Sequence, residues 1–342
     1  MEVLPDFSRL SISEQPEVDF SKKPIPRQVA KAHKNAIWRI YNVGDFFVTT
    51  SYDKTAKMWK AGEYHLKFWR SLPHSRSVLC AERLSTNRFV TGAWNEQKNQ
   101  ISLWTDQGKK LRDFGVHRYG VYALRKLSEN CLASSSCDYP GRRHSGPWKF
   151  TIQLRDIEKA NVIRVLEGHK GGIPVLENLN QDLFLSASAD RTIRVWDKNE
   201  GKETMQFQGQ FGFYDAKPLD ERTIVSGSQY MHGARYQGSL RLVSRWDWRE
   251  QKPVSHYAGH ATTVYCVLPL TKHLFATGSR DRTIRIWDVR KGQSVQTIEG
   301  EGYFYSMAKW GSSILCGIGY PRGQRSGRRN FVPISIYDFS DK

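Results

Sequence analysis

Short runs of alternating apolar and polar residues, separated by turn residues, make up most of the chain. TIRIWD from Thr283 and SVQTI from Ser294 are two examples. Successive side chains of a strand point to opposite sides, so this period-two pattern predicts β-strands, and closely spaced turn residues predict antiparallel pairing. The pattern therefore indicates an all-β protein built from many short strands.

Three stretches of the chain are near copies of one another: SYDKTAKMWK from Ser51, SADRTIRVWD from Ser188 and SRDRTIRIWD from Ser279. In each, an aspartate stands six residues before a tryptophan, and a histidine stands 20 or 21 residues before the aspartate. The three sets are His33, Asp53 and Trp59; His169, Asp190 and Trp196; and His260, Asp281 and Trp287. These sets resemble the WD-repeat family, whose signature joins a Gly-His to a later Ser-x-Asp and Trp-Asp. Such regular spacing is a strong signal of internal repeats.

Weaker copies fill the gaps between these three. The tryptophan position recurs seven times, at Trp59, Trp104, Arg155, Trp196, Trp246, Trp287 and Tyr337. Seven units predict an all-β, seven-bladed β-propeller of WD repeats, with one antiparallel blade per unit. The chain after Tyr337 is too short for an outer strand, whereas residues 26–33 look like the end of a unit. We therefore expect an amino-terminal strand to complete the last blade and to remove an exposed sheet edge.

The chain divides into two parts by charge and by repeats. Residues 1–20 contain five acidic residues and one arginine, a net charge of −4, whereas the whole chain has 52 basic and 34 acidic residues and a net charge of +18. We expect an acidic, flexible arm over residues 1–24 and one propeller domain over residues 25–342. The charge contrast leads to the hypothesis that the arm competes with the ligand for basic loops.

Four of the seven units carry extra residues in the turn between their second and third strands. The inserted stretches are AWNEQKNQ from Ala93, CDYPGRRHSGPWK from Cys137, SQYMHGARYQGS from Ser228 and GYPRGQRSGRRN from Gly319. Equivalent turns of a propeller leave the same face, so we expect the insertions to gather there.

The inserted loops supply the first group of candidate ligand-binding residues. They are Tyr139, Arg142, Arg143, His144, Tyr230, Arg235, Tyr236, Tyr320, Arg322, Arg325, Arg328 and Arg329. Arginine presents a planar pair of donors to phosphate or carboxylate, and tyrosine adds a rigid ring with a hydroxyl. The alternative interpretation is that the loops are solvated and only aid solubility.

A second candidate site lies on the innermost strands. The residue after the first apolar residue of these strands is aromatic in five units: Trp38, Tyr122, Tyr214, Tyr265 and Tyr305. Strand alternation directs this position away from its buried neighbour and toward the central channel, near the face with the insertions. The family resemblance implies that this channel rim binds short peptides, as it does in related propellers. The alternative is ordinary channel lining.

We expect the recurring histidines to be structural. His33, His74, His117, His169 and His260 each stand four residues before the apolar start of an innermost strand. The resemblance implies that such a histidine hydrogen-bonds the turn aspartate and supports the tryptophan. No metalloprotease, phosphate-binding-loop or hydrolase-nucleophile motif is present in the sequence. We therefore expect no catalytic residues, metal or cofactor, and an enzyme is the least favoured class.

One local motif indicates a kind of partner. Trp-Asp-x-Arg occurs in units five and six and resembles the docking signature of WD-repeat substrate receptors for cullin-RING ubiquitin ligases. The residues carried over are Asp247, Arg249, Asp288 and Arg290. The motif also occurs in WD repeats without that role, and unit five lacks the upstream aspartate.

The positive net charge favours an anionic partner. Five scattered cysteines without a Cys-x-x-Cys spacing, no signal peptide and no membrane-spanning run lead us to expect a soluble intracellular protein of the cytoplasm or nucleus. We expect a non-catalytic scaffold, a monomeric propeller within a larger complex, that binds an acidic or phosphorylated protein segment on its arginine- and tyrosine-rich loop face. The alternatives are an RNA-binding component of a ribonucleoprotein and a substrate receptor of a cullin-RING ligase.

Overall fold

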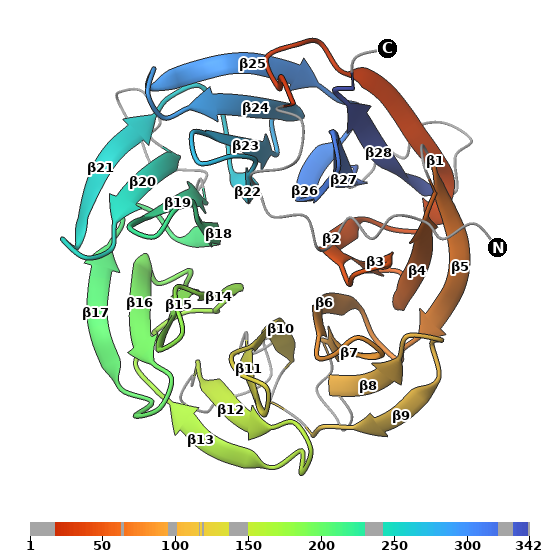
Figure 1. Cartoon of the computed structure of the whole chain (residues 1–342), viewed down its shortest axis with the longest axis vertical. Coiled ribbons are helices and arrows are strands. Elements are labelled where there is room, and N and C mark those ends of the chain that lie inside the picture. The colour runs from red at the N-terminus through yellow and green to blue at the C-terminus, as the bar shows by residue number, and fades with distance from the viewer. Residues whose placement is uncertain are drawn as a thin grey trace, which may run out of the picture.

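The chain forms seven antiparallel sheets of four strands each, arranged around one axis (Figure 1). The computed structural model describes residues 18–62, 65–94, 101–115, 117, 120–136, 150–229, 242–320 and 331–340. Every regular element within these ranges is a β-strand. The predicted all-β, seven-bladed propeller is therefore confirmed, and the seven repeats of the sequence are its blades.

Blades one to seven follow the chain, and each blade places its strands from the axis outward (Figure 1). The innermost strands are β2 (Ile37–Asn42), β6 (Val78–Arg83), β10 (Val121–Lys126), β14 (Val175–Asn178), β18 (Phe213–Pro218), β22 (Val264–Pro269) and β26 (Tyr303–Trp310). The second strands are β3 (Phe46–Ser51), β7 (Arg88–Ala93), β11 (Cys131–Ser136), β15 (Leu183–Ala187), β19 (Thr223–Ser228), β23 (Leu274–Ser279) and β27 (Ser313–Gly319). The third strands are β4 (Thr55–Ala61), β8 (Ile101–Thr105), β12 (Ile152–Asp156), β16 (Thr192–Asp197), β20 (Val243–Asp247), β24 (Thr283–Asp288) and β28 (Val332–Asp338). The outermost strands are β5 (Leu66–Pro73), β9 (Lys110–Asp113), β13 (Val162–Leu166), β17 (Glu203–Gln208), β21 (Lys252–Tyr257), β25 (Gln293–Glu299) and, in blade seven, β1 (Ile25–His33).

The outermost strand of blade seven comes from the opposite end of the chain. β1 pairs antiparallel with β28, from Ile25 opposite Asp338 to Val29 opposite Ile334. Arg27 adds an ion pair, with a guanidinium nitrogen 3.2 Å from the Asp338 carboxylate. This pairing of the two chain ends in one sheet (Figure 1) confirms that an amino-terminal strand closes the ring.

Neighbouring strands of a blade run in opposite directions, so the turns of a blade alternate between the two faces of the ring. The turns between second and third strands and the connections to the next blade lie on one face, which we call the insert face. The other turns lie on what we call the opposite face. The insertions occupy residues 94–100, 137–151, 229–242 and 320–331, each between a second and a third strand as predicted.

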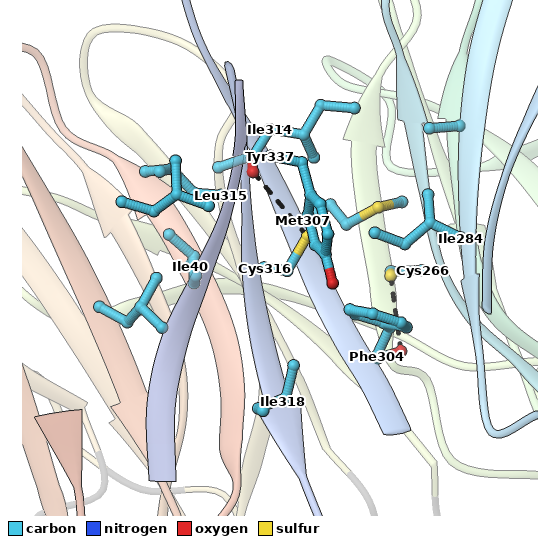
Figure 2. Packing of buried hydrophobic residues seen from close by; sticks show 14 of the residues in the cluster. Ile40, Cys266, Ile284, Phe304, Met307, Ile314, Leu315, Cys316, Ile318 and Tyr337 are labelled. Atoms are coloured by element: carbon cyan, nitrogen blue, oxygen red, sulfur yellow. Dashed lines mark hydrogen bonds between the residues drawn. The ribbon is translucent and has the colours of Figure 1, made fainter. Parts of the chain in front are cut away.

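Apolar side chains fill the space between adjacent blades. Figure 2 shows one such cluster, in which Phe304 and Cys316 of blade seven gather with Cys266 and Ile284 of blade six. Phe304 is fully buried, and burial of a side chain of this size stabilises a fold by about 1.5 to 3 kcal/mol. Gly278 allows the close approach, because a Cβ there would lie 2.8 Å from the Phe304 side chain.

Blades one, four and six each contain a buried hydrogen-bond network made by the signature residues. In blade six, His260 Nδ1 lies 2.8 Å from the Asp281 carboxylate, and His260 Nε2 lies 2.7 Å from Thr277 Oγ1. The indole Nε1 of Trp287 donates to the same hydroxyl at 2.8 Å. The equivalent sets are His33, Asp53, Thr49 and Trp59 in blade one and His169, Asp190, Ser186 and Trp196 in blade four. These histidines thus have the structural role that the family resemblance implied.

Blades two and three keep only the inner part of this network. In blade two, Thr91 Oγ1 lies 2.8 Å from His74 Nε2 and accepts a hydrogen bond from Trp104. In blade three, Arg155 occupies the tryptophan position, and it bonds the same serine hydroxyl as His117. Burial lowers the pKa of His74 to about 4 and that of His117 to about 3, so both imidazoles are neutral at neutral pH.

Candidate functional site

A β-bulge marks the start of six of the seven innermost strands. In each, the register shifts so that two residues of the innermost strand lie opposite one residue of the second strand. The bulged residues are Trp38, Leu79, Tyr122, Tyr214, Tyr265 and Tyr305. Bulges re-aim side chains and occur often beside functional sites. All five aromatic residues predicted for the channel rim lie in these bulges, so the bulge, rather than simple strand alternation, sets their direction.

These five aromatic side chains form a connected arc around the axis. Tyr265 packs against Tyr305 with ring centroids 4.6 Å apart, and Tyr214 meets Tyr265 at 5.1 Å. Trp38 contacts Tyr305 at 5.3 Å and Tyr122 at 6.4 Å. The arc runs from blade five through blades six, seven and one to blade three, so the structure brings all five predicted rim residues together.

Three further aromatic residues, which no sequence pattern had indicated, extend the arc. Tyr52 and Trp94 contact the bulged aromatic residues of blades one and three, with ring centroids 5.3 and 6.3 Å apart. Tyr303 contacts the bulged tyrosine of its own strand at 6.4 Å. Tyr52 and Trp94 each directly follow a second strand, and this shared position is the signal that could have found them. We call the eight residues the aromatic collar: Trp38, Tyr52, Trp94, Tyr122, Tyr214, Tyr265, Tyr303 and Tyr305.

Arg280 places a positive charge at the edge of the aromatic collar. Its guanidinium lies over the ring of Tyr303, 5.5 Å from the centroid, and this cation–π contact orients the planar group. A side-chain hydrogen bond with Tyr303 raises the pKa of Arg280. Burial raises the pKa of Tyr305 to about 12, so its hydroxyl keeps its proton at neutral pH. Blades six and seven thus present an oriented cation beside tyrosine hydroxyls.

Blade four interrupts the aromatic collar. Its innermost strand pairs without a bulge, and the position equivalent to the bulged tyrosines is Pro174. The position equivalent to Tyr52 is Ala189. Lys170 and Arg191 nearby are exposed, and their charged groups form no ion pair with the residues that the structure describes. Blade four therefore forms a sector of small and basic side chains between the insertions of blades three and five.

A layer of ion pairs with buried carboxylates follows the aromatic collar along the innermost strands. Arg39 of blade one reaches Asp215 of blade five at 3.6 Å and donates to a backbone carbonyl of blade five at 3.1 Å. Arg125 of blade three lies 2.5 Å from the carboxylate of Glu177 in blade four, which also pairs with Lys217 of blade five. Burial acts to raise the pKa of Glu177, but the two cations outweigh it and lower that pKa. The pair between Arg39 and Asp215 thus joins blades on opposite sides of the axis, whereas the two pairs of Glu177 join neighbouring blades.

Most residues of the predicted loop site lie outside the described residues. These are Tyr139, Arg142, Arg143, His144, Tyr230, Arg235, Tyr236, Arg322, Arg325, Arg328 and Arg329. Tyr320, the remaining member, is half-buried and packs against the core cluster of blade seven. It thus stands at the base of the blade-seven insertion, on the insert face.

The two Trp-Asp-x-Arg motifs lie on the opposite face, in the turns that follow β20 and β24. Asp288 pairs with Arg290 of the same turn at 2.8 Å, whereas Asp247 pairs with Arg222. The Arg249 guanidinium lies 5.4 Å from the ring centroid of the neighbouring tryptophan. These turns and the aromatic collar therefore lie on separate surfaces of the ring.

Comparison with known proteins agrees with this architecture. The family model described as WD domain, G-beta repeat matches residues 25–60, 160–197 and 251–288. A guanine nucleotide-binding protein subunit beta from Nicotiana plumbaginifolia is 30% identical over 261 residues, which cover 70% of this chain and 67% of that protein. The chain belongs to the WD-repeat family. The matched ranges of this WD-repeat protein end with the third strands of blades one, four and six, the blades with the complete signature network.

Two other relatives share less of their length with this WD-repeat protein. A ribosome biogenesis protein WDR12 homolog from Drosophila mojavensis is 23% identical over 276 residues, which cover 74% of this chain and 61% of the relative. Nuclear distribution protein nudF from Aspergillus niger is 29% identical over 245 residues, which cover 62% of this chain and 50% of the relative. The chain thus spans only half to about three fifths of these relatives. The WD40 β-propeller domain of Doa1 has the same fold, with a TM-score of 0.70 at 17% identity over 94% of this chain and 97% of that one.

The described part of the chain contains neither a group of three or more His, Cys, Asp or Glu side chains placed to hold a metal ion nor a helix long and apolar enough to cross a bilayer. The cysteines in this part are free thiols: Cys80, Cys131, Cys266 and Cys316. Burial raises the pKa of Cys80, Cys266 and Cys316, so these thiols are protonated and unreactive.

Proposed function

We propose that this WD-repeat protein is a non-catalytic interaction module that binds an acidic or phosphorylated protein segment on its insert face. The aromatic collar carries the proposal, because it presents rigid rings and tyrosine hydroxyls around one axis. A peptide lying on the collar packs its apolar parts on the rings and accepts hydrogen bonds from the hydroxyls.

The charges around the aromatic collar favour an anionic segment. Arg280 stands at its edge over Tyr303, and Lys170 and Arg191 stand exposed on blade four. An oriented guanidinium binds phosphate or carboxylate through paired hydrogen bonds, which are about twice as strong as neutral ones. The inserted loops add Arg142, Arg143, Arg235, Arg322, Arg325, Arg328 and Arg329 as further donors in this proposal.

Blade four supports one route for the bound segment. Pro174 and Ala189 make it the least bulky sector around the collar, and Lys170 and Arg191 attract acidic residues there. We infer that the segment leaves the collar across blade four. Ala189→Trp places a large ring on this route without changing the collar, so we expect it to weaken binding of the acidic peptide.

The geometry of the histidines supports a non-catalytic role. A general base must come within hydrogen-bond distance of its substrate. His33 and His260 are buried and have both ring nitrogens bonded to the signature residues of blades one and six. Burial lowers the pKa of both. The ring nitrogens of these two histidines therefore stabilise the fold and are not available to a substrate.

Fluorescence anisotropy with labelled acidic peptides, phosphorylated and unphosphorylated, tests the proposal. Arg280→Gln removes the cation at the collar, and we expect about tenfold weaker binding from the loss of charge-assisted hydrogen bonds. Arg290→Gln is the matched control, because its side chain is exposed on the opposite face, and we expect it to bind as the wild type does. Equal affinity of the Arg280→Gln and wild-type proteins would place the site elsewhere.

RNA is the second candidate ligand. The relatives named as ribosome biogenesis proteins favour it, and unpaired bases stack well on aromatic side chains. Anisotropy of labelled single-stranded RNA across a salt series separates the two ligands. Affinity at physiological salt that falls steeply with salt, with a slope that Arg280→Gln reduces, favours RNA. Binding at low salt alone leaves the acidic segment as the ligand.

The opposite face leaves room for a second partner. We infer that the protein works within a larger complex, in the cytoplasm or nucleus, because relatives are named for ribosome biogenesis and nuclear distribution. A cullin-RING adaptor docked on this face is compatible with either ligand. Replacing both Arg249 and Arg290 by Ala should abolish adaptor copurification and leave peptide binding intact; retained copurification contradicts the docking role.

A further inference from the structure

The segment before β1 is anchored to the propeller by one buried aromatic residue. Phe20 is 1% exposed, and its ring meets that of Phe339 edge-on at 5.0 Å. The Lys309 ammonium lies 5.8 Å from the Phe20 ring centroid. The Gln296 side chain donates to a backbone carbonyl two residues beyond Phe20, at 2.6 Å. The expected flexible arm over residues 1–24 therefore includes a packed portion.

The anchor lies on the opposite face of the ring. Phe339 directly follows β28, and Lys309 is the penultimate residue of β26; both strands end on that face. Residues 1–17 lie outside the described residues, but they join the propeller at this point. The hypothesis that this acidic segment competes for the loops of the insert face thus requires it to pass the full depth of a blade.

A tight turn holds Phe20 in place. The Asp19 carboxylate accepts hydrogen bonds from the Ser21 amide at 3.0 Å and from the Ser21 hydroxyl at 2.6 Å. The Phe20 amide donates to the Val18 carbonyl and the Lys22 amide to the Asp19 carbonyl. Asp19 and Ser21 are exposed on either side of the buried ring. The position of Phe20 therefore depends on a hydrogen bond that an enzyme in solution can reach.

We propose that Ser21 is a phosphorylation site and that its phosphorylation releases Phe20 from the propeller. A protein kinase transfers the γ-phosphoryl group of ATP to Ser21 Oγ, and ADP and the hydroxyl proton are released. Ser21 is exposed and precedes β1. The kinase can therefore draw the segment into its active site without breaking a strand pair.

Phosphate turns the contact between Ser21 and Asp19 from attractive to repulsive. It removes the proton that Ser21 donates and places a charge of about −1.5 to −2 beside the Asp19 carboxylate. Lys22 and Lys23 follow in the sequence and attract the phosphate to their own side. The turn then opens, and the ring between its two ends is withdrawn from Phe339.

Release changes two features of the opposite face. It uncovers the Phe339 ring, and it adds residues 18–24 to the acidic segment that precedes β1. Seven more extended residues lengthen its reach by about 24 Å. Phosphorylation of Ser21 thus controls where the acidic segment can act.

Hydrogen–deuterium exchange of the full-length protein tests this proposal. The amides of residues 20–22 are bonded within the turn, so they report its opening directly. With phosphoserine installed at position 21, we expect these amides to exchange at least ten times faster than in the wild type. Ser21→Glu is expected to give a smaller change in the same direction, because a carboxylate carries less charge.

Two variants make the result decisive. Phe20→Ala removes the anchor and should reproduce the faster exchange without any added charge. Ser85→Glu adds a charge in another exposed turn, where the Ser85 hydroxyl donates to Asn87 at 2.9 Å, and it should leave residues 20–22 unchanged. Wild-type exchange in the phosphoserine protein, alongside fast exchange in Phe20→Ala, overturns the switch. Wild-type exchange in Phe20→Ala overturns the anchor itself.

Discussion

The three short blades and the four blades with insertions use the same turn in different ways. In blades one, four and six, the turn between the second and third strands supplies an aspartate that bonds the blade's histidine, as Asp281 bonds His260. In blades two, three, five and seven the same turn carries the insertion. Each of these turns therefore either completes the buried hydrogen-bond network of its blade or carries an insertion.

The blades with insertions show how much of the network survives without the aspartate. Thr91 still joins His74 to Trp104 in blade two, and the Ser226 hydroxyl still accepts from Trp246 in blade five. The hydrogen bonds to the hydroxyl of the second strand persist because they join neighbouring strands of the blade. The aspartate is lost with the insertion because it belongs to the turn.

The largest effect is expected from the tryptophan position. Trp287 is fully buried, so Trp287→Ala should lower the free energy of unfolding by about 3 to 5 kcal/mol, measured by urea denaturation. Trp104→Ala should cost nearly as much if the inner hydrogen bonds carry most of the stability. Phe68→Ala, at a ring that is 51% exposed, is the control. A much smaller loss for Trp104→Ala would show that the turn aspartate matters more than we infer.

The next effect concerns acid stability. An unfolded histidine has a pKa of about 6.5, whereas burial lowers the pKa of His74 to about 4. Its contribution is therefore complete above pH 6.5 and is lost as the pH falls toward 4, by roughly 3 kcal/mol. Urea denaturation at pH 7, 6 and 5 should show a shallower pH dependence for His74→Gln than for the wild type. Parallel curves would mean that other groups dominate the acid transition.

The turn aspartate itself should have an intermediate effect. Asp281→Asn leaves the buried His260 without its charged partner, and we expect a loss of about 2 kcal/mol in the free energy of unfolding. Asp113→Asn in blade two breaks a more exposed pair with Lys110 and should cost about 0.5 kcal/mol or less. Equal losses in the free energy of unfolding for Asp281→Asn and Asp113→Asn would show that the turn aspartate does not stabilise blade six more than an exposed ion pair stabilises blade two.

The smallest effect on stability is expected from the insertions. Replacing residues 229–241 of blade five by the short turn of blade six, residues 280–282, leaves the buried Leu242 in place. This change should alter the free energy of unfolding by less than about 1 kcal/mol, because loop-closure entropy varies slowly with length. Affinity for an acidic peptide should fall in the same protein. A strongly destabilised variant would indicate that the insertion is part of the fold.

The fold could be predicted because its signals are local and periodic. The tryptophan position that recurs from Trp59 to Tyr337 marks the third strand of each blade, and the likeness of residues 26–33 to the end of a unit indicated the strand that completes the last blade. The same spacing showed where the insertions lie. These features depend on residues close together in the sequence or on the count of repeats.

The rest depends on contacts between distant residues. Trp38 contacts Tyr122, and Tyr265 contacts Tyr305, only when the ring of blades closes. The spacing of residues in the sequence did not predict the bulges that orient these side chains. The ion pair between Arg39 and Asp215 joins blades that are not adjacent. Phe20 lies outside the repeats and directly follows acidic residues. The sequence therefore did not indicate that this residue packs against the propeller.

Blade four has no aromatic residue at either collar position, and this difference distinguishes one direction around the axis of the propeller. Seven similar blades around an axis offer a bound chain seven equivalent ways to lie. Pro174 and Ala189 remove this degeneracy, because one sector of the circle differs from all others. In the proposed complex, a bound segment would therefore have a defined direction, and a second partner docked elsewhere on the ring would meet it at a constant angle.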